Sequence, residues 1–330
     1  MEPSPPAVPA VVTDPAAWSS PGGTSDAPRF RSDPTRFEAP ARPTRALPGS
    51  PVDRLQPRTV GQLLDGGFEV LRFRVRSIAI VSAVIVLPLY ALPQLLVVFT
   101  TRLTDTTGFS PSGNPFLTSG GEISGGFWTT IGLGYLAGFG LMVATMLMGV
   151  AVTHLVTGWM VGQDPSPADT LRFVRSVLPR ALGAFLLVAL LKAIGAIPCG
   201  LGLVYLIPSL SILAPVVAAE GAGVIESIRR SFRLSRRRFG TVFGVVVLWW
   251  LASSLVGFAT GLAAASVGGL ATGSERGVAT VVQSADVVAT IVLAVVQVAV
   301  TVLLYIDLRV RTEGLDLDLE ATERFGATAR

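Results

Sequence analysis

The side chains most able to do chemistry are scarce in this chain. It has one histidine (His154), one cysteine (Cys199) and one lysine (Lys192), the last among 26 basic residues. A disulfide framework or a Cys/His zinc site needs several such residues. A single chain therefore cannot build either, and most histidine-dependent catalysis is excluded as well. The sequence predicts a non-enzymatic protein that uses no metal and no cofactor.

Polar residues inside long apolar runs are the remaining candidates for function. An ionisable group at membrane depth costs several kcal/mol unless it is paired or reaches the surface. Lys192 would meet Glu220 or Asp286 only if the bundle brought those ends inward. Gln283, Asp286 and Gln297 could line a polar path with His154 and Lys192. The interpretation we favour is that His154 and Lys192 snorkel or make structural polar contacts. Gln297 would then form a hydrogen bond with another helix. The candidates are His154, Lys192, Asp286 and Gln297.

Composition indicates which solvent the chain is built for. Half of the 330 residues are hydrophobic, 15 % are charged and the mean hydropathy is +0.61. Soluble domains carry about 25 % charged residues. No Asp, Glu, Lys or Arg occurs between 123 and 163. The net charge is only +4 and the arginines lie beside apolar runs, which indicates membrane topology rather than nucleic-acid binding. We therefore expect an all-α, polytopic membrane helix bundle.

Six apolar runs are long enough to cross a bilayer, which takes about 20 helical residues. Pro88 and Pro93 should bend the first run, and Pro208 and Pro215 should make the fourth irregular. The transmembrane domain would cover 59–306, between a disordered, proline-rich tail over 1–58, which holds 13 of the 23 prolines, and a polar tail over 307–330. The expected spans are 77–99, 128–160, 181–197, 201–219, 240–265 and 287–306.

Arginines follow a one-sided pattern along the six expected spans. With both termini cytoplasmic, most of them fall on the cytoplasmic side, and the other side carries only Arg102 and Arg276. Trp128 and Trp159 stand where an aromatic belt would lie. Three amphipathic surface helices would place basic side chains among anionic lipid headgroups. The arginines assigned to that contact are Arg72, Arg74, Arg76, Arg180, Arg229, Arg230, Arg233, Arg236, Arg237 and Arg238.

A repeat organises these surface helices. An acidic residue is followed eleven positions later by arginine and then by a span, in the pairs Asp65 and Arg76, Asp169 and Arg180, and Glu226 and Arg237. Eleven residues make about three helical turns, so both charges would share one face. The chain would then consist of three units, each a surface helix, an outward span and a return span. The alternative is that any surface helix preceding a span has this pattern.

Small residues suggest how two spans pack. In the fifth expected span they recur every four residues, which lets another helix approach closely where lipid gives no hydrophobic drive. The alternative is chance, because Ala and Gly are common in this chain. The second span, with Gly149 on a similar face, is the expected partner. The residues assigned to packing are Gly134, Gly138, Ser253, Gly257, Gly261 and Ala265.

Three segments resemble a known family. They are LQPRTVGQLLDGGFEVLRFRVRSI (55–78), APVVAAEGAGVIESIRRSFRLSRRRFGTVFGVVVL (214–248) and LLYIDLRVRTEGLDLDL (303–319). They look like actinobacterial proteins named for a glycerophosphoryl diester phosphodiesterase membrane domain. The resemblance implies a membrane domain that can be fused to a phosphodiesterase barrel. Such a barrel needs about 250 residues of alternating strands and helices, which this chain does not offer. We therefore do not expect phosphodiesterase activity.

Two functions fit these observations. The first is a non-enzymatic scaffold or accessory protein of a bacterial plasma membrane, with the bilayer, anionic lipid headgroups and a membrane protein as partners and no nucleic acid. The second is a transporter or flippase for an amphipathic envelope molecule. A water-filled cavity that reaches His154, Lys192 or Gln297 would favour transport, and a dry bundle would favour the scaffold.

Overall fold

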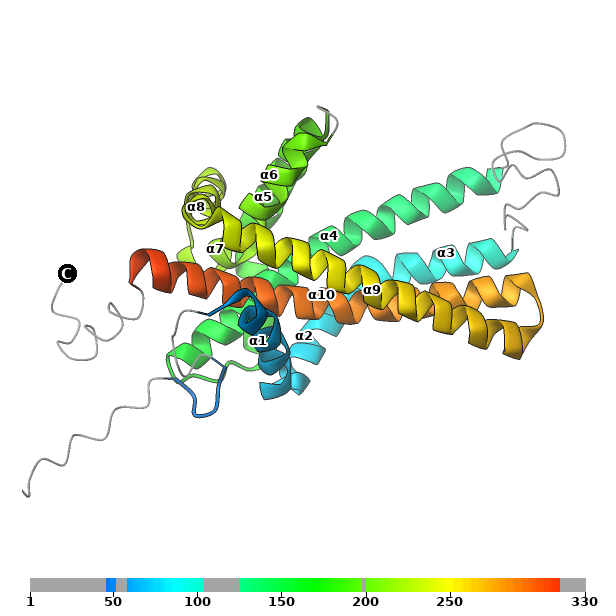
Figure 1. Ribbon diagram of the computed structural model, residues 1–330, viewed down its shortest axis with the longest axis horizontal. Coiled ribbons are helices and arrows are strands. Elements are labelled where there is room, and N and C mark those ends of the chain that lie inside the picture. Colours follow the sequence, from blue (N-terminus) through cyan, green and yellow to red (C-terminus); the bar gives the residue numbers. More distant parts are fainter. Residues whose placement is uncertain (1–45, 52–57, 104–124, 198–199, 315–330) are drawn as a thin grey trace, which may run out of the picture. The chain divides into compact units, whose positions relative to one another are not determined.

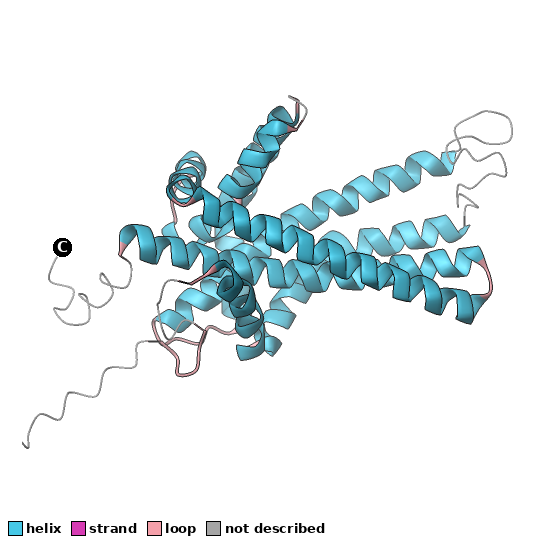
Figure 2. Ribbon diagram, in the orientation of Figure 1, coloured by secondary structure: helices cyan, strands magenta, loops and turns pink. Residues whose placement is uncertain are grey.

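The architecture comes from a computed structural model, which describes residues 46–51, 58–103, 125–197 and 200–314. Within these residues the regular structure is helical and contains no strand (Figure 2). The elements are α1 (Val60–Phe73), α2 (Val75–Val86), the π-helix η2 (Leu87–Ala91), α3 (Leu92–Leu103), α4 (Gly125–Met160), α5 (Pro167–Ala196), α6 (Leu201–Leu210), α7 (Leu213–Glu220), α8 (Val224–Arg237), α9 (Phe239–Thr272) and α10 (Glu275–Glu313).

Six stretches of the described chain are long and apolar enough to span a membrane, which confirms the expected all-α, six-span fold class. α2, η2 and most of α3 form the first, and α6 and α7 together form the fourth. The six stretches are Val75–Phe99, Ile131–Met160, Pro167–Ala196, Leu201–Glu220, Phe239–Thr272 and Gly277–Glu313. These six stretches make the chain a multi-pass membrane protein.

Helices α4 and α10 form the centre of the bundle. α4 packs against α2, η2, α3, α5, α7 and α10, while α10 packs against α1, α3, α4, α7, α8 and α9. Helices α9 and α10 run side by side over much of their length (Figure 1). Both helices contribute fully buried residues to the core, among them Ala144, Val150, Leu155, Val302 and Leu304.

The first span changes helix type where its prolines lie. Pro88 has no N–H, so it cannot complete the α-helical ladder, and the chain forms a π-helical turn over Leu87–Ala91. The Leu92 N–H accordingly bonds the Leu87 carbonyl five residues back. α4 crosses this turn so closely that a Cβ on Gly140 would overlap the Leu89 carbonyl. Gly140 is thus the glycine that allows α4 to meet η2.

α1 is held against α10 by a pair of glycines. Thr59 and Gln62 form a capping box that starts the helix. Gly66 and Gly67 are buried, and a Cβ on Gly67 would lie 2.5 Å from a methyl group of Val300 and 3.3 Å from its backbone nitrogen. The backbone of α1 therefore rests directly on α10.

Helices α6 and α7 are two pieces of one irregular span, as its prolines predicted. The chain leaves α-helical geometry at Ile212, between Pro208 and Pro215, and the carbonyl of Ser209 lies beside this break. Buried hydroxyls on α8 replace the missing partners, because Ser231 and Ser235 donate to that carbonyl at 2.8 and 3.2 Å. α8 thus buries serines as well as Ile228 and Leu234 against the bundle.

The structure supports a repeat of two units in a register different from the predicted one. α1 and α8 each have 14 residues, and each ends in a break, at Arg74 (φ −139°, ψ 53°) and at Arg238 (φ −135°, ψ 41°). These breaks lie 164 positions apart, whereas the charge pairs predicted 161. The second unit has no break, because α5 continues through Pro179 as one helix. The three-unit pattern of separate surface helices is therefore wrong for α5.

Residues 46–51 pack on the bundle, so the expected tail boundary at residue 58 is wrong for them. The Leu47 N–H donates to the Trp159 carbonyl at 2.9 Å, and Ser50 and Pro51 are buried. Trp159 itself is 0 % exposed and meets Phe73 edge to face, with ring centroids 5.1 Å apart. It is a core residue and not part of an aromatic belt, because this segment and α1 cover it. Residues 1–45 and 315–330 lie outside the described residues.

The small residues that the sequence assigned to packing in the fifth span lie on α9, and α9 packs against a different helix from the one expected. α9 packs mainly on α10, not on the second span, and its buried small residues are Ala264 and Gly268. A Cβ on Gly134, Gly138, Gly257 or Gly261 would meet nothing within 4 Å, so these four do not mark close helix contacts. Ser253 and Ala265 are half-buried on the same face of α9. Spacing alone misled because it cannot tell a close contact from open space beside lipid.

Candidate functional site

One cavity among the described residues lies within the membrane-spanning part of the bundle. It has a volume of about 260 Å³ and is lined by α4, α5, α6, the start of α7, α9 and α10. Most of its wall is apolar, with Met142, Met146, Phe185, Leu210 and Leu304 among the lining residues. We call this cavity the central pocket. Its volume is slightly below the range of about 300–1,000 Å³ typical of small-molecule sites.

Lys192 enters the central pocket from α5. Phe185, Val188 and Lys192 are spaced three and four residues apart, so they share one face of this helix, and all three line the pocket. The side chain is half-buried, and among the described residues it has no ion pair and no hydrogen bond. The expected partners Glu220 and Asp286 are not in contact with it. Lys192 is thus an unpaired ammonium group beside apolar walls.

Gln297 faces the same pocket from α10, so the structure brings together two of the four polar residues singled out from the sequence. The pocket hydroxyls of Thr145, Ser211 and Thr301 donate within their own segments, to the carbonyls of Met142, Pro208 and Gln297. The Gln297 amide has no side-chain hydrogen bond within the described part of the chain. Lys192 and Gln297 are therefore two free donors at the pocket.

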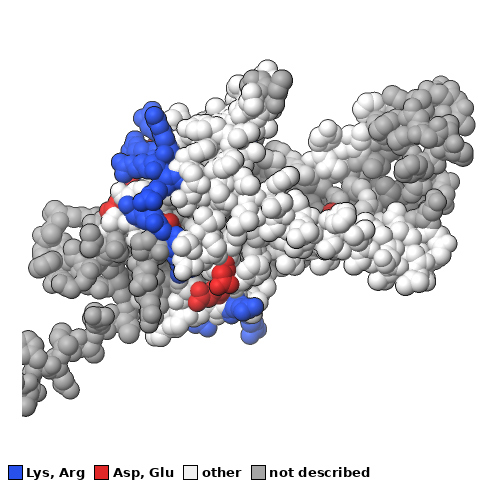
Figure 3. All heavy atoms as spheres, in the orientation of Figure 1, with Lys and Arg blue, Asp and Glu red and all other residues white. Residues whose placement is uncertain are grey.

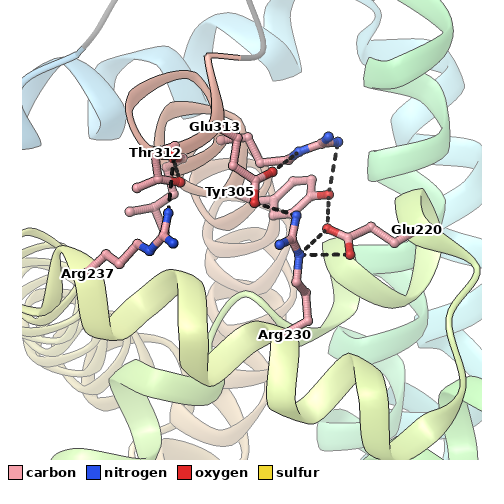
Figure 4. A network of polar contacts seen from close by, with 8 residues as sticks. Glu220, Arg230, Arg237, Tyr305, Thr312 and Glu313 are labelled. Carbon is pink, nitrogen blue, oxygen red and sulfur yellow. Dashed lines mark hydrogen bonds and ion pairs between the residues drawn. The ribbon is translucent and has the colours of Figure 1, made fainter. Parts of the chain in front are cut away.

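A charged network lies beyond the pocket, at the ends of α7 and α10. Leu213 and Ala214 line the pocket at the start of α7, and Glu220 ends the same helix. Glu220 accepts from Arg230 Nε at 3.0 and 3.1 Å and from the Tyr305 hydroxyl at 3.1 Å. Glu313 binds Arg230 at 2.5 Å and Arg309 at 3.1 Å. We call these five residues the α7–α8–α10 network (Figure 4).

The charged side chains of this network are mostly buried, and each is paired with an opposite charge. The side chains of Arg230 and Glu220 are 23 % and 20 % exposed. Partial burial lowers the pKa of Arg230, but the hydrogen bonds and charges of Glu220 and Glu313 outweigh it and raise the pKa overall. Arg230 is therefore a structural cation. Its assignment to lipid headgroups is wrong, because it faces α7 and α10.

A second polar cluster ties the start of α1 to α10. Asp307 is buried and accepts from the Arg58 backbone N–H at 2.7 Å and from Arg311 Nε at 2.9 Å. Arg311 in turn donates to the Arg58 carbonyl at 2.6 Å. The side chains at 305, 309 and 313 thus turn toward α7 and α8, while those at 307 and 311 hold the chain before α1.

Both clusters were missed as sites from the sequence, although a signal was present. Tyr305, Arg309 and Glu313 recur every four residues, as do Asp307 and Arg311, which places each set on its own helix face. The partners Glu220, Arg230 and Arg58 lie far away in the chain. Helical spacing can therefore reveal the two faces, but not what each face meets.

His154 lies apart from the central pocket. Its ring stacks on Phe173 of α5, with centroids 4.2 Å apart and an interplanar angle of 12°. It borders a shallow hollow together with Asp164 and Asp169. Asp164 is paired with Arg74 at 2.7 Å, and Asp169 with Arg172 at 3.0 Å. No group of three or more His, Cys, Asp or Glu side chains in the described residues could hold a metal ion. The arrangement is that of an aromatic contact near a helix end.

Asp286 does not share a site with the other polar candidates. It lies on α10, eleven residues before Gln297, which corresponds to about 16 Å along the helix axis. Its side chain is exposed. The polar path that would have joined His154, Lys192, Asp286 and Gln297 is therefore not formed in the described part of the molecule.

The basic residues gather at one end of the bundle, where α8 lies (Figure 3). Arg74 and Arg180 are exposed but each has a protein partner, Asp164 for Arg74 and the Gly221 carbonyl for Arg180. Arg237 donates to the Thr312 carbonyl at 3.2 Å. The other assigned arginines stand exposed on α1, α2, α8 and the α8–α9 break, namely Arg72, Arg76, Arg229, Arg233, Arg236 and Arg238.

Comparison of the chain with family models, with curated proteins and with solved structures found no match. The resemblance to the phosphodiesterase membrane domain therefore remains an expectation.

Proposed function

We propose that this protein binds an amphipathic envelope molecule in the central pocket and carries it across or along the membrane. The observation that carries the proposal is a cavity at membrane depth lined by two free polar side chains, the half-buried Lys192 and the exposed Gln297. Polar groups in a membrane bundle are costly unless they are satisfied, and they commonly mark a substrate pathway. An amphipathic molecule would satisfy them with its headgroup and match the apolar walls with its chain.

The rim of the pocket supports this proposal. Met142 and Ile207 line the pocket and are 43 % and 42 % exposed, so its wall continues onto the outer surface of the spans. A molecule could then enter from the bilayer without passing through the charged network. Methionine side chains at the wall can adapt to chains of different shape. This geometry favours transport over a purely structural role, which needs no cavity.

The orientation is part of the proposal. Because translocated loops avoid basic residues, the arginine-rich end would face the cytoplasm, with both termini on that side. The membrane would be the bacterial plasma membrane. The exposed arginines of α8 would then contact anionic headgroups of the inner leaflet.

A substitution that fills the pocket tests the function. Ala189 lines the pocket, whereas its neighbour Leu190 is exposed on the outside of α5. In proteoliposomes loaded with a fluorescent phospholipid analogue, we expect the wild-type protein to speed its transbilayer movement. Ala189→Phe should reduce this movement at least fivefold, and Leu190→Phe should leave it unchanged. Equal rates with and without wild-type protein, together with no saturable binding of any amphipath, would exclude this function.

A scaffold is the second candidate, and the exposed arginines of α8 favour it. Such a protein would act by holding anionic lipids and a membrane-protein partner at the arginine-rich end. Purification in a mild detergent would then recover one envelope protein or one lipid class in fixed proportion. Loss of that proportion in Arg233→Gln and Arg236→Gln, but not in Ala189→Phe, would favour the scaffold over the transporter.

A further inference from the structure

We infer that the central pocket selects an oxyanion headgroup, such as a phosphate, sulfate or carboxylate, attached to an apolar chain, with Lys192 as its counter-charge. This inference rests on the proposed function and names the chemical class of its ligand. It follows from the charge of the pocket, from its hydrogen-bonding groups and from its size.

The charge of the pocket is uncompensated. Lys192 brings a cation, and none of the described residues that line the pocket is acidic. The carboxylates at the ends of α7 and α10 already have partners. Glu220 binds Arg230 and Tyr305. Glu313 binds Arg230 and Arg309. In an apolar surrounding an unpaired cation attracts an anion strongly. A ligand that brings the anion would complete the pair.

The lysine cannot reach the membrane surface at the arginine-rich end of the bundle. It lies twelve residues after Arg180, which corresponds to about 18 Å along α5, more than half of the apolar thickness of about 30 Å. A lysine side chain is shorter than that distance. The side chain lines the central pocket instead.

The hydrogen-bonding groups also favour an oxyanion. An ammonium group offers three donors and no acceptor, and a glutamine amide offers two further donors. The hydroxyls of Thr145, Ser211 and Thr301 have committed their protons to backbone carbonyls. Their oxygens can still accept, so the donors that are free to bind a ligand include the Lys192 ammonium and the Gln297 amide. A headgroup with several acceptor oxygens matches them, whereas a cationic headgroup such as choline does not.

The pocket is large enough for only part of the ligand. A volume of about 260 Å³ suits a headgroup with a short length of chain, not a whole two-chain lipid. The remaining chain would leave past Met142 and Ile207, which are exposed at the rim. A free inorganic anion would satisfy Lys192 but would leave the apolar wall bare. We therefore assign the site to an amphipath.

Binding measurements on the full-length protein in a nonionic, maltoside detergent test the assignment. Trp249 lines the pocket, so tryptophan fluorescence can report occupancy. The probes are decyl phosphate, inorganic phosphate, and decylphosphocholine as the charge-compensated control. We expect saturable binding of decyl phosphate, at least tenfold weaker binding of the other two probes, and a loss of at least tenfold for decyl phosphate in Lys192→Met. Lys192→Arg keeps the charge and should retain most of the affinity.

The outcomes separate this inference from the proposed function. If decyl phosphate and decylphosphocholine bind equally, and Ala189→Phe abolishes both while Lys192→Met changes neither, the pocket binds amphipaths but the oxyanion assignment is wrong. If inorganic phosphate binds as well as decyl phosphate, the ligand is a free anion and the amphipath assignment is wrong. If no probe binds to the folded wild-type protein, both the inference and the proposed function fail. Thermal transitions of the variants show that each is folded.

Discussion

At the scale of single residues, the charges of this protein fall into paired and unpaired groups. The α7–α8–α10 network and the Asp307 cluster pair arginines with carboxylates at the ends of helices. Partly buried charges of this kind hold a structure because removing one partner leaves the other unsatisfied. Lys192 has no such partner among the described residues. Pairing thus separates residues that hold the bundle from the residue proposed to bind a ligand.

Glu220→Gln tests the structural role of the network. The change removes the charge that faces Arg230 and weakens the acceptor of the Tyr305 hydroxyl. We expect a loss of about 1.5–3 kcal/mol in the free energy of unfolding, the range for hydrogen bonds to charged groups. Thermal unfolding in detergent measures the loss as a lower transition temperature.

The matched control for this change is Glu226→Gln. Glu226 stands in the first turn of α8 and is exposed. Because a charge near a helix N-terminus contributes less than about 1 kcal/mol at the surface, this variant should stay close to the wild type. Transition temperatures lowered equally by both changes would contradict the role assigned to Glu220.

At the scale of helices, glycine matters where backbones meet. Gly67 allows α1 to rest on α10, and Gly140 allows α4 to cross η2. The predicted stripe of α9 has room beside Gly257 and Gly261. Helix association in lipid depends on close packing rather than on escape from water. A glycine therefore indicates a contact only when another backbone is shown to approach it.

Gly67→Leu tests how α1 docks. The new side chain would collide with Val300, so α1 should move away from α10 and the transition temperature should fall by several degrees. Gly61→Leu in the same helix is the control, because a Cβ there meets nothing within 4 Å. Both changes raise helix propensity by a similar amount. A stable Gly67→Leu protein with a cleavage pattern like that of Gly61→Leu in limited proteolysis would show that α1 does not dock as described.

At the scale of the whole molecule, the arginines predict how the bundle is oriented. Cysteines placed at opposite ends test this orientation in a Cys199→Ser background. Gln163→Cys lies between α4 and α5 at the arginine-rich end, and Ala271→Cys lies at the end of α9. Both positions are exposed. In intact cells, an impermeant thiol reagent should label Ala271→Cys and spare Gln163→Cys, because positive ends stay in the cytoplasm. The reverse labelling would invert the topology, whereas permeabilised cells should label both.

The sequence predicts local structure well and contacts between distant segments poorly. The caps at Thr59 and Ser166, the irregularities near Pro88 and Pro208 and the six apolar stretches follow from local chemistry. The tail boundary, the belt position of Trp159 and the second-span partner of α9 were wrong. Each of these three depends on which distant segment covers a surface, and no local pattern encodes that choice.

The sequence by itself determined the six apolar stretches and their basic end, because hydropathy, length and proline chemistry act within a few residues. Only the tertiary structure decided that Lys192 and Gln297 share a pocket while His154 and Asp286 stay apart. It also decided that Arg230 turns toward Glu220 and Glu313 rather than toward lipid. The physical reason is that lipid tails are as apolar as the helix surfaces, so helix neighbours are chosen by shape and polar contacts between distant segments.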